Sequence, residues 1–169
     1  MINPMDLTGR TILVTGASSG IGRSTCIILA DLGARVILVA RREATLHETL
    51  SMMSGSEHIV VPFDLTNIDM IPEWLKEIAG KYGKLHGLVH SAGIQLIRAI
   101  RDIDSDSIHN VMSINFDAAM GLIRGFRHKQ VYADGASIVL LSSVAGLTGT
   151  AGNSLYSASK GAIIALVRS

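Results

Sequence analysis

The chain is poor in the residues that build disulfide frameworks, metal sites and aromatic binding surfaces. Among its 169 residues there is one cysteine, and aromatic residues make up 4%. One cysteine excludes an internal disulfide, and Cys26, next to two isoleucines, is expected to be a small buried residue. The six histidines are scattered without the spacing of metal ligands, so we expect no metal site.

The chain also lacks an excess of charge of either sign and any long hydrophobic run. Fifteen basic residues face 14 acidic ones, and no basic patch or aromatic platform points to nucleic acid. Mean hydropathy is +0.39. However, no apolar run approaches the roughly 20 residues of a spanning helix, so no membrane partner is expected. The N-terminus has neither the basic start nor the apolar core of a signal peptide, and we expect a cytoplasmic protein.

Short apolar runs alternate with segments of helical periodicity along the whole chain. This alternation predicts an α/β fold, a doubly wound parallel sheet with strand order 3-2-1-4-5. Asp104 or Ser105 is expected to cap the fourth helix. The expected strands are 11–15, 35–40, 58–63, 85–90 and 136–142, and the expected helices are 21–32, 42–53, 70–82, 104–128 and 154–169.

A glycine-rich turn, T-G-A-S-S-G-I-G from Thr15 to Gly22, joins the first expected strand to the first helix. Gly16 allows a tight turn, while Gly20 and Gly22 remove Cβ atoms where the backbone would approach a pyrophosphate. The free N–H groups at the helix start would face the phosphates. A tight strand–helix turn without a ligand is the alternative. The candidate cofactor contacts here are Gly16, Ser18, Ser19, Gly20, Ile21 and Gly22.

A second motif lies far downstream, at Tyr156-Ser157-Ala158-Ser159-Lys160. Residues four apart share a helix face, so Tyr156 and Lys160 can enter one site, although such a pair alone usually marks a solvated face. Ser143 precedes Tyr156 by 13 residues and ends an apolar run. With the glycine turn, these features make the chain resemble the short-chain dehydrogenase/reductase family. It is similar to 3-oxoacyl-acyl-carrier-protein reductases and other carbonyl reductases.

The resemblance covers essentially the whole chain and implies a single NAD(P)-binding Rossmann-type domain over residues 1–169. The family continues with a further strand, a substrate-covering segment and usually a final strand. Those parts have no counterpart in this sequence, which stops inside the helix expected after residue 153. We therefore expect this to be a fragment of a longer protein, or a sequence that ends early.

The resemblance also assigns catalytic roles. Tyr156 would exchange the proton with the substrate oxygen, and Lys160 would favour the phenolate and hold the ribose hydroxyls of the cofactor. Ser143 would orient the substrate, with Ser142 as its structural neighbour. Asn115, 22 residues past Gly93, would hold a water that links the lysine to solvent. A mid-helix asparagine is consistent with a kink, and an ordinary exposed asparagine is the alternative.

Cofactor choice depends on the end of the second strand, where NAD-preferring relatives usually carry Asp and this chain has Ala40. Arg41 and Arg42 follow, and a guanidinium suits the 2′-phosphate of NADP. Alternatively, both arginines only begin a solvated helix. NADP is therefore the expected cofactor and NAD the alternative. A basic residue at the position of Ser19, common in NADP-dependent relatives, is missing.

Two further segments resemble the family's cofactor contacts. Asp64 would bind the adenine amino group with help from the Leu65 N–H, or else cap the turn at Thr66-Asn67. Ala92 and Gly93 match the family's N-N-A-G motif and would lie against the nicotinamide ribose. His90 replaces an asparagine that tethers neighbouring strands in the family, and Ser91 also departs from the motif. We interpret His90 as a structural residue.

These features predict an oxidoreductase that transfers a hydride between NADP(H) and a small carbonyl or alcohol substrate, most simply a 3-oxoacyl or other carbonyl reductase. The alternatives are an NAD-dependent alcohol dehydrogenase and a non-catalytic NADP-binding or assembly module. A small apolar helix face suits contact with a second subunit and predicts a homodimer or homotetramer, unless the face packs on the sheet within one chain. This face consists of Ala158, Gly161, Ala162 and Ala165.

Overall fold

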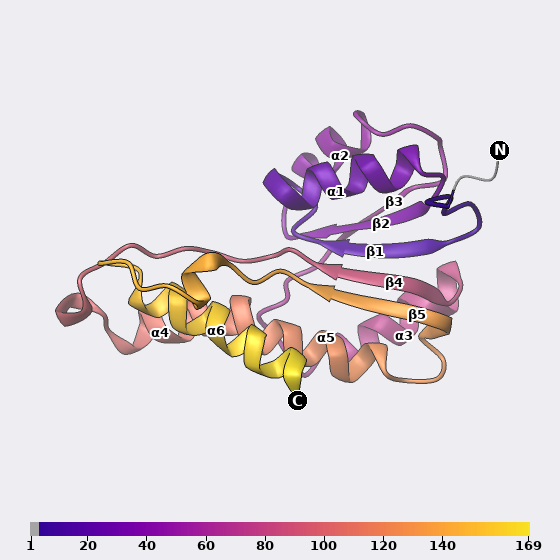
Figure 1. Cartoon of the computed structure of the whole chain (residues 1–169). Coiled ribbons are helices and arrows are strands. Elements are labelled where there is room, and N and C mark those ends of the chain that lie inside the picture. The colour runs from indigo at the N-terminus through magenta and orange to yellow at the C-terminus, as the bar shows by residue number, and fades with distance from the viewer. Residues whose placement is uncertain (1–3) are drawn as a thin grey trace.

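The computed structural model describes residues 4–169 and contains one five-stranded parallel sheet with the order β3-β2-β1-β4-β5 (Figure 1). This confirms the predicted doubly wound α/β fold and its strand order. The strands are β1 (Thr11–Thr15), β2 (Arg35–Ala40), β3 (Ile59–Pro62), β4 (Leu85–His90) and β5 (Tyr132–Leu140). No helix among the described residues is long and apolar enough to cross a membrane.

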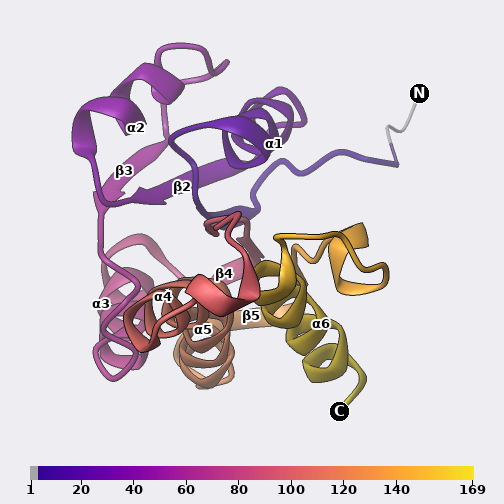
Figure 2. The same cartoon turned by 90° about the vertical axis from the view of Figure 1, so that its left-hand side faces the viewer.

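The helices form a layer on each face of the sheet. In Figures 1 and 2, α1 (Gly20–Asp31) and α2 (Glu43–Leu50) cover the β1–β3 half of one face. The other helices lie across the opposite face. They are α3 (Ile71–Tyr82), α4 (Ser105–Met112), α5 (Ala118–Phe126) and α6 (Ser154–Arg168). Three short turns complete the set, η1 (Ile100–Asp102), η2 (Ser113–Asp117) and η3 (Val144–Gly146).

Each face of the sheet has its own core because successive side chains of a strand point to opposite sides. In β1, Leu13 packs with Leu75 of α3 and Leu122 of α5. Val14, the next residue, belongs to a cluster of buried hydrophobic residues on the opposite face that includes Cys26 of α1. Cys26 is fully buried, as expected, and burial raises the pKa of its thiol to about 12. The continuous apolar runs of β1 and β2 therefore reflect a sheet covered on both faces.

The structure corrects two of the expected elements. The helix expected over 104–128 is α4 and α5 joined by the π-helical turn η2, which contains Asn115. Asp104 caps α4, because its carboxylate accepts a hydrogen bond from the Ser107 N–H at 2.8 Å. The strand expected over 136–142 instead runs from Tyr132 to Leu140. The sequence does not predict the first residues of this strand, because Gly135, with φ +72°, interrupts the extended pattern. The register opposite β4 is also irregular there.

The parallel register brings the carboxyl ends of all strands to one edge of the sheet. Thr15 at the end of β1 pairs with His90 at the end of β4, and His90 pairs with Leu140 of β5. The chain segments that follow β4 and β5 extend from this edge and run together toward the start of α6 (Figure 1). Ligands of doubly wound sheets bind at such an edge, which makes it the expected place of a site.

Candidate active site

A cavity of about 340 Å³ lies at the carboxyl edge, in front of the turn between β1 and α1. Most of the residues around it come from the loops after β1, β2, β3 and β4, and the start of α1 and the turn η2 supply others. Eleven of the predicted cofactor contacts line this cavity: Gly16, Ser18, Ser19, Gly20, Ile21, Arg41, Arg42, Asp64, Leu65, Ala92 and Gly93. The fold therefore gathers into one cavity residues that the sequence separates by up to 77 positions.

The glycine turn is built around a close approach between the start of α1 and the end of β1. A Cβ atom on Gly22 would lie 2.2 Å from the carbonyl oxygen of Gly16. A Cβ on Gly16, which has φ +69°, would lie 2.7 Å from the backbone nitrogen of Ala92. Gly22 does not line the cavity but lets α1 begin directly behind the turn. A side chain at Gly16 would therefore push the turn away from the segment after β4, and one at Gly22 would push α1 away from the turn.

A smaller cavity of about 170 Å³ contains Tyr156 and Lys160. Both cavities are lined by Ile21, Ser91, Gly93 and Ile94, so they lie next to each other. Lys160 is 6% exposed, and burial lowers the pKa of its ammonium group. Its Nζ donates to the Leu141 carbonyl at 2.8 Å and lies 5.8 Å from the centre of the Tyr156 ring. Tyrosine and lysine thus face one another next to the larger cavity.

Asn115 is fully buried, so the alternative of an exposed asparagine is wrong. Its Oδ1 accepts from the Ile94 N–H at 2.8 Å, and its Nδ2 donates to the Ile94 carbonyl at 2.9 Å. The same Nδ2 donates to Ser159 Oγ at 2.9 Å, and the Ser159 hydroxyl donates to the Tyr156 carbonyl at 2.7 Å. Asn115 therefore ties the segment after β4 to the helix that carries the tyrosine and the lysine.

Gly93 lies where these groups meet. A Cβ atom at this position would be 3.2 Å from Asn115 Oδ1 and 3.5 Å from Lys160 Nζ. The first distance is tighter than an ordinary contact, and Asn115 Oδ1 is held by its bond to the Ile94 N–H, whereas the second distance is ordinary van der Waals contact. Gly93 lines both cavities, so a side chain there would press on Asn115 at the place where the two cavities meet.

The two serines after β5 occupy different places. Ser142 lines the smaller cavity, and its hydroxyl donates to the Lys160 carbonyl at 2.8 Å. Ser143 is not part of that lining, and its hydroxyl accepts from the Ala145 N–H at 3.2 Å at the start of η3. The resemblance to the family assigns the substrate-orienting role to Ser143, which precedes Tyr156 by 13 residues. Of the two adjacent serines, however, Ser142 is the one that lines the cavity with Tyr156 and Lys160.

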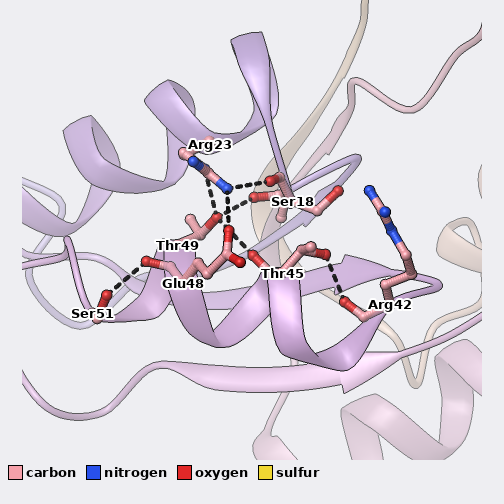
Figure 3. Close-up of polar contacts among 8 residues, drawn as sticks. Ser18, Arg23, Arg42, Thr45, Glu48, Thr49 and Ser51 are labelled. Carbon is pink, nitrogen blue, oxygen red and sulfur yellow. Dashed lines mark hydrogen bonds and ion pairs between the residues drawn. The ribbon is translucent and has the colours of Figure 1, made fainter.

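Asp64 caps its own turn, since one carboxylate oxygen accepts from both the N–H and the hydroxyl of Thr66, at 3.0 and 2.9 Å. It is exposed and also lines the larger cavity, so capping leaves the adenine role open. Arg41 and Arg42 are exposed, and within residues 4–169 neither forms an ion pair. Figure 3 shows the Arg42 side chain extending from the start of α2.

His90 is a buried neutral residue beside the lysine. It is 3% exposed, and burial, reinforced by the positive charge of Lys160, lowers its pKa to about 4. Its Nδ1 lies 2.8 Å from Thr15 Oγ1, which also accepts from the Ala92 N–H at 3.3 Å. His90 therefore links the ends of β4 and β1. It supplies the connection between neighbouring strands that an asparagine supplies in the family.

The predicted small face of α6 is divided. Gly161 approaches η3 of the same chain, where a Cβ on Gly146 would lie 2.9 Å from the Gly161 nitrogen. Ala158 and Ala165 are exposed. Part of this face thus packs within the chain, though on η3 rather than on the sheet. The part around the two exposed alanines is open to solvent in the single chain.

Sequence reasoning missed several residues that shape the site. Thr15 and Ser159 lie inside the two quoted motifs but differ in no obvious way from their neighbours there. Arg23 and Thr49 contact the glycine turn from α1 and α2, and no local pattern in the sequence marks them. Only the packing of α1 against α2 could have identified that pair.

The fold is that of the dinucleotide-binding α/β proteins, and a tyrosine–lysine pair lies beside the cavity that the predicted dinucleotide contacts line. The chain belongs to the short-chain dehydrogenase family, because the model of that family matches residues 10–169. Members of this class are NAD(P)-linked oxidoreductases.

Curated relatives and solved structures agree with this assignment. The chain is 34% identical to L-xylulose reductase of Caenorhabditis elegans, over 96% of the present chain. It is 32% identical to the ketoacyl reductase HetN of a Nostoc species, over 94% of the present chain. It spans 65% of the first relative and 56% of the second. A short-chain dehydrogenase from Shigella flexneri superimposes with a TM-score of 0.88 at 30% identity, covering 98% of this chain and 68% of that one. A protein of Escherichia coli CFT073 solved with NADPH has a TM-score of 0.88 at 32% identity, covering 97% and 71%.

Proposed function

We propose that the protein is an NADP(H)-dependent oxidoreductase that interconverts a carbonyl and an alcohol group of a small substrate. The observation that carries this proposal is that two cavities lie next to each other and share lining residues. One gathers the predicted dinucleotide contacts, and the next holds Tyr156 and Lys160. The names of two relatives, L-xylulose reductase and ketoacyl reductase, indicate enzymes that reduce carbonyl groups.

The residues present fit a dinucleotide. The turn after β1 has no side chain at Gly20, and a Cβ there would meet no atom within 4 Å, so the backbone is open to the cavity. Arg41 and Arg42 offer two cations at the end of β2, where a 2′-phosphate would distinguish NADP from NAD. Ala92 and Gly93 leave room for the nicotinamide ribose. When bound, the dinucleotide supplies the hydride.

The chain's own residues handle the proton and the orientation of the substrate. Tyr156 donates its hydroxyl proton to the carbonyl oxygen during reduction and takes the alcohol proton in the reverse direction. The Lys160 ammonium stabilises the negative charge that the phenol oxygen acquires. Ser143 donates a hydrogen bond to the substrate oxygen. Asn115, on a π-helical turn, holds the water through which Lys160 exchanges its proton with solvent.

Cofactor binding is tested first, by titrating the chain with NADPH and with NADH while following nicotinamide fluorescence. We expect tighter binding of NADPH, and replacement of Arg41 by Ala is expected to weaken NADPH binding about tenfold while changing NADH binding little. Equal loss for both cofactors would contradict the phosphate role of Arg41. Preference for NADH would favour the NAD-dependent alternative within the same family.

Turnover is tested with a panel of aldehydes, ketones and 3-oxoacyl thioesters. Tyr156→Phe removes only the phenolic oxygen, so we expect turnover to be lost while NADPH affinity stays within about twofold. If this variant retains wild-type turnover, Tyr156 is not the proton donor. If the wild-type chain binds NADPH but turns over no carbonyl of the panel, the non-catalytic binding module becomes the better interpretation.

A further inference from the structure

The turn between β1 and α1 has backbone donors that the protein itself does not use. Ser18 and Ser19 both line the larger cavity. Within residues 4–169, no hydrogen bond of ordinary geometry runs from the N–H of either residue to a protein atom. Unpaired backbone donors beside a cavity indicate that a ligand or solvent completes them.

The carbonyl groups of the same turn are held from behind by two helices. Thr49 of α2 is fully buried, and its hydroxyl donates to the Ala17 carbonyl at 2.9 Å. Arg23 of α1 donates from Nη2 to the Ser18 carbonyl at 2.6 Å. Figure 3 shows both side chains converging on the turn from the junction of the two helices. Both carbonyls are therefore directed toward the α1–α2 junction.

A planar trans peptide directs its C=O and the following N–H in opposite directions. No peptide bond in the described part of the chain is cis. Holding the Ala17 carbonyl thus sets the direction of the Ser18 N–H, and holding the Ser18 carbonyl sets that of the Ser19 N–H. We propose that Thr49 and Arg23 are positioning residues that aim these two backbone donors at the phosphate groups of the dinucleotide. The inference rests on the proposed function, whose cofactor site it explains.

Thr49 and Arg23 act together because they are bonded to one another. Arg23 Nε donates to Thr49 Oγ1 at 3.0 Å, and Arg23 Nη2 also contacts Glu48 at 3.2 Å. Thr49 Oγ1 therefore accepts from the arginine while donating to the turn. The network joins the glycine turn to α2, which begins directly after Arg42. The network therefore connects the turn that carries the two N–H donors to the helix that begins where the two arginines end β2.

Thr49→Val tests this inference with little change of shape, because valine replaces the hydroxyl by a methyl group. We expect the dissociation constants of NADPH and of ADP, which lacks the nicotinamide half, to rise roughly tenfold. Thr49→Ser keeps the hydroxyl and is expected to restore both values to within about threefold. Saturating NADPH should return kcat to near the wild-type value, because only the phosphate contacts are affected. Equal affinities for Val, Ser and wild-type proteins would overturn the proposal.

Arg23→Met removes the second contact, with Lys76→Met as the matched control. Lys76 forms a 2.9 Å ion pair with Glu73 on α3 and lines neither cavity of the site. We expect Arg23→Met to weaken NADPH and ADP binding roughly tenfold and Lys76→Met to leave both unchanged. Equal effects of the two substitutions would contradict a specific role for Arg23.

A readout without any cofactor separates this inference from the proposed function. The amide signals of Ser18 and Ser19 are followed by NMR in the ligand-free chain, whose fold is checked by circular dichroism. We expect Thr49→Val and Arg23→Met to shift and broaden these two signals relative to the wild type and to Lys76→Met. Unchanged signals overturn the inference. If the signals change as expected but the wild type binds neither NADPH nor NADH, the proposed function fails and the orientation of the turn stands.

Discussion

The burial of His90 beside Lys160 predicts a pH dependence of stability that can be measured directly. The pKa of His90 in the folded chain is about 4, against an ordinary value of 6.5. Between these values the unfolded chain binds a proton that the folded chain does not bind. The contribution of neutral His90 to the free energy of unfolding is therefore fully present above pH 6.5 and is lost as the pH falls toward 4. His90 is 3% exposed, so solvent screening removes little of the effect.

The size of the effect follows from the two pKa values. Each pKa unit corresponds to about 1.4 kcal/mol, so the full difference approaches about 3.4 kcal/mol below pH 4. Between pH 7 and pH 5 the expected loss from this one histidine is about 2 kcal/mol. His90→Asn removes the titrating group, and its amide can still bond the Thr15 hydroxyl. The difference in unfolding free energy between the wild type and this variant should therefore change by about 2 kcal/mol over that range, to the disadvantage of the wild type.

The assay is equilibrium unfolding in urea at pH 7, 6 and 5, followed by tryptophan fluorescence. Trp74 is the sole tryptophan, and it is buried and stacked on Phe63 at 4.1 Å, so its emission reports the state of the core. Burial and the charge of Arg10 also lower the pKa of His86, but both proteins contain that residue and its contribution cancels. If wild type and variant lose stability in parallel between pH 7 and pH 5, the account of His90 is wrong.

Four further substitutions test the site and the core. Gly93→Ala introduces a Cβ 3.2 Å from Asn115 Oδ1, and we expect turnover to fall at least about tenfold. Unchanged kinetics would show that the site tolerates a methyl group at this position. Ser143→Ala is expected to lower kcat about a hundredfold and Ser142→Ala only severalfold, and the reverse order would transfer the substrate-orienting role to Ser142. Leu122→Ala, at a fully buried position, should lower the unfolding free energy by about 2–5 kcal/mol in urea titrations, and a loss below about 1 kcal/mol would contradict its place in the core.

The sequence was sufficient to predict the fold, because the signals for it are local, and the resemblance to the family pointed to most of the residues that line the larger cavity. Continuous apolar runs such as Val36–Val39 are typical of strands buried on both faces, and the glycines from Gly16 to Gly22 indicate a tight turn between strand and helix. Once the strand order is known, the loops at the carboxyl edge must lie together. The predicted contacts at Asp64 and Gly93 therefore reached the same cavity without any pairwise signal between them.

Only the tertiary structure decided which side chains hold these loops in place. The bonds of Arg23 and Thr49 to the glycine turn depend on how α1 packs against α2, and no periodicity records that contact. Likewise, the clamp of Asn115 on Ile94 and the pairing of His90 with Thr15 join residues 21 and 75 positions apart. Local propensity and spacing determine the elements and their order. The distances, burial and protonation that give the site its chemistry arise only when those elements pack.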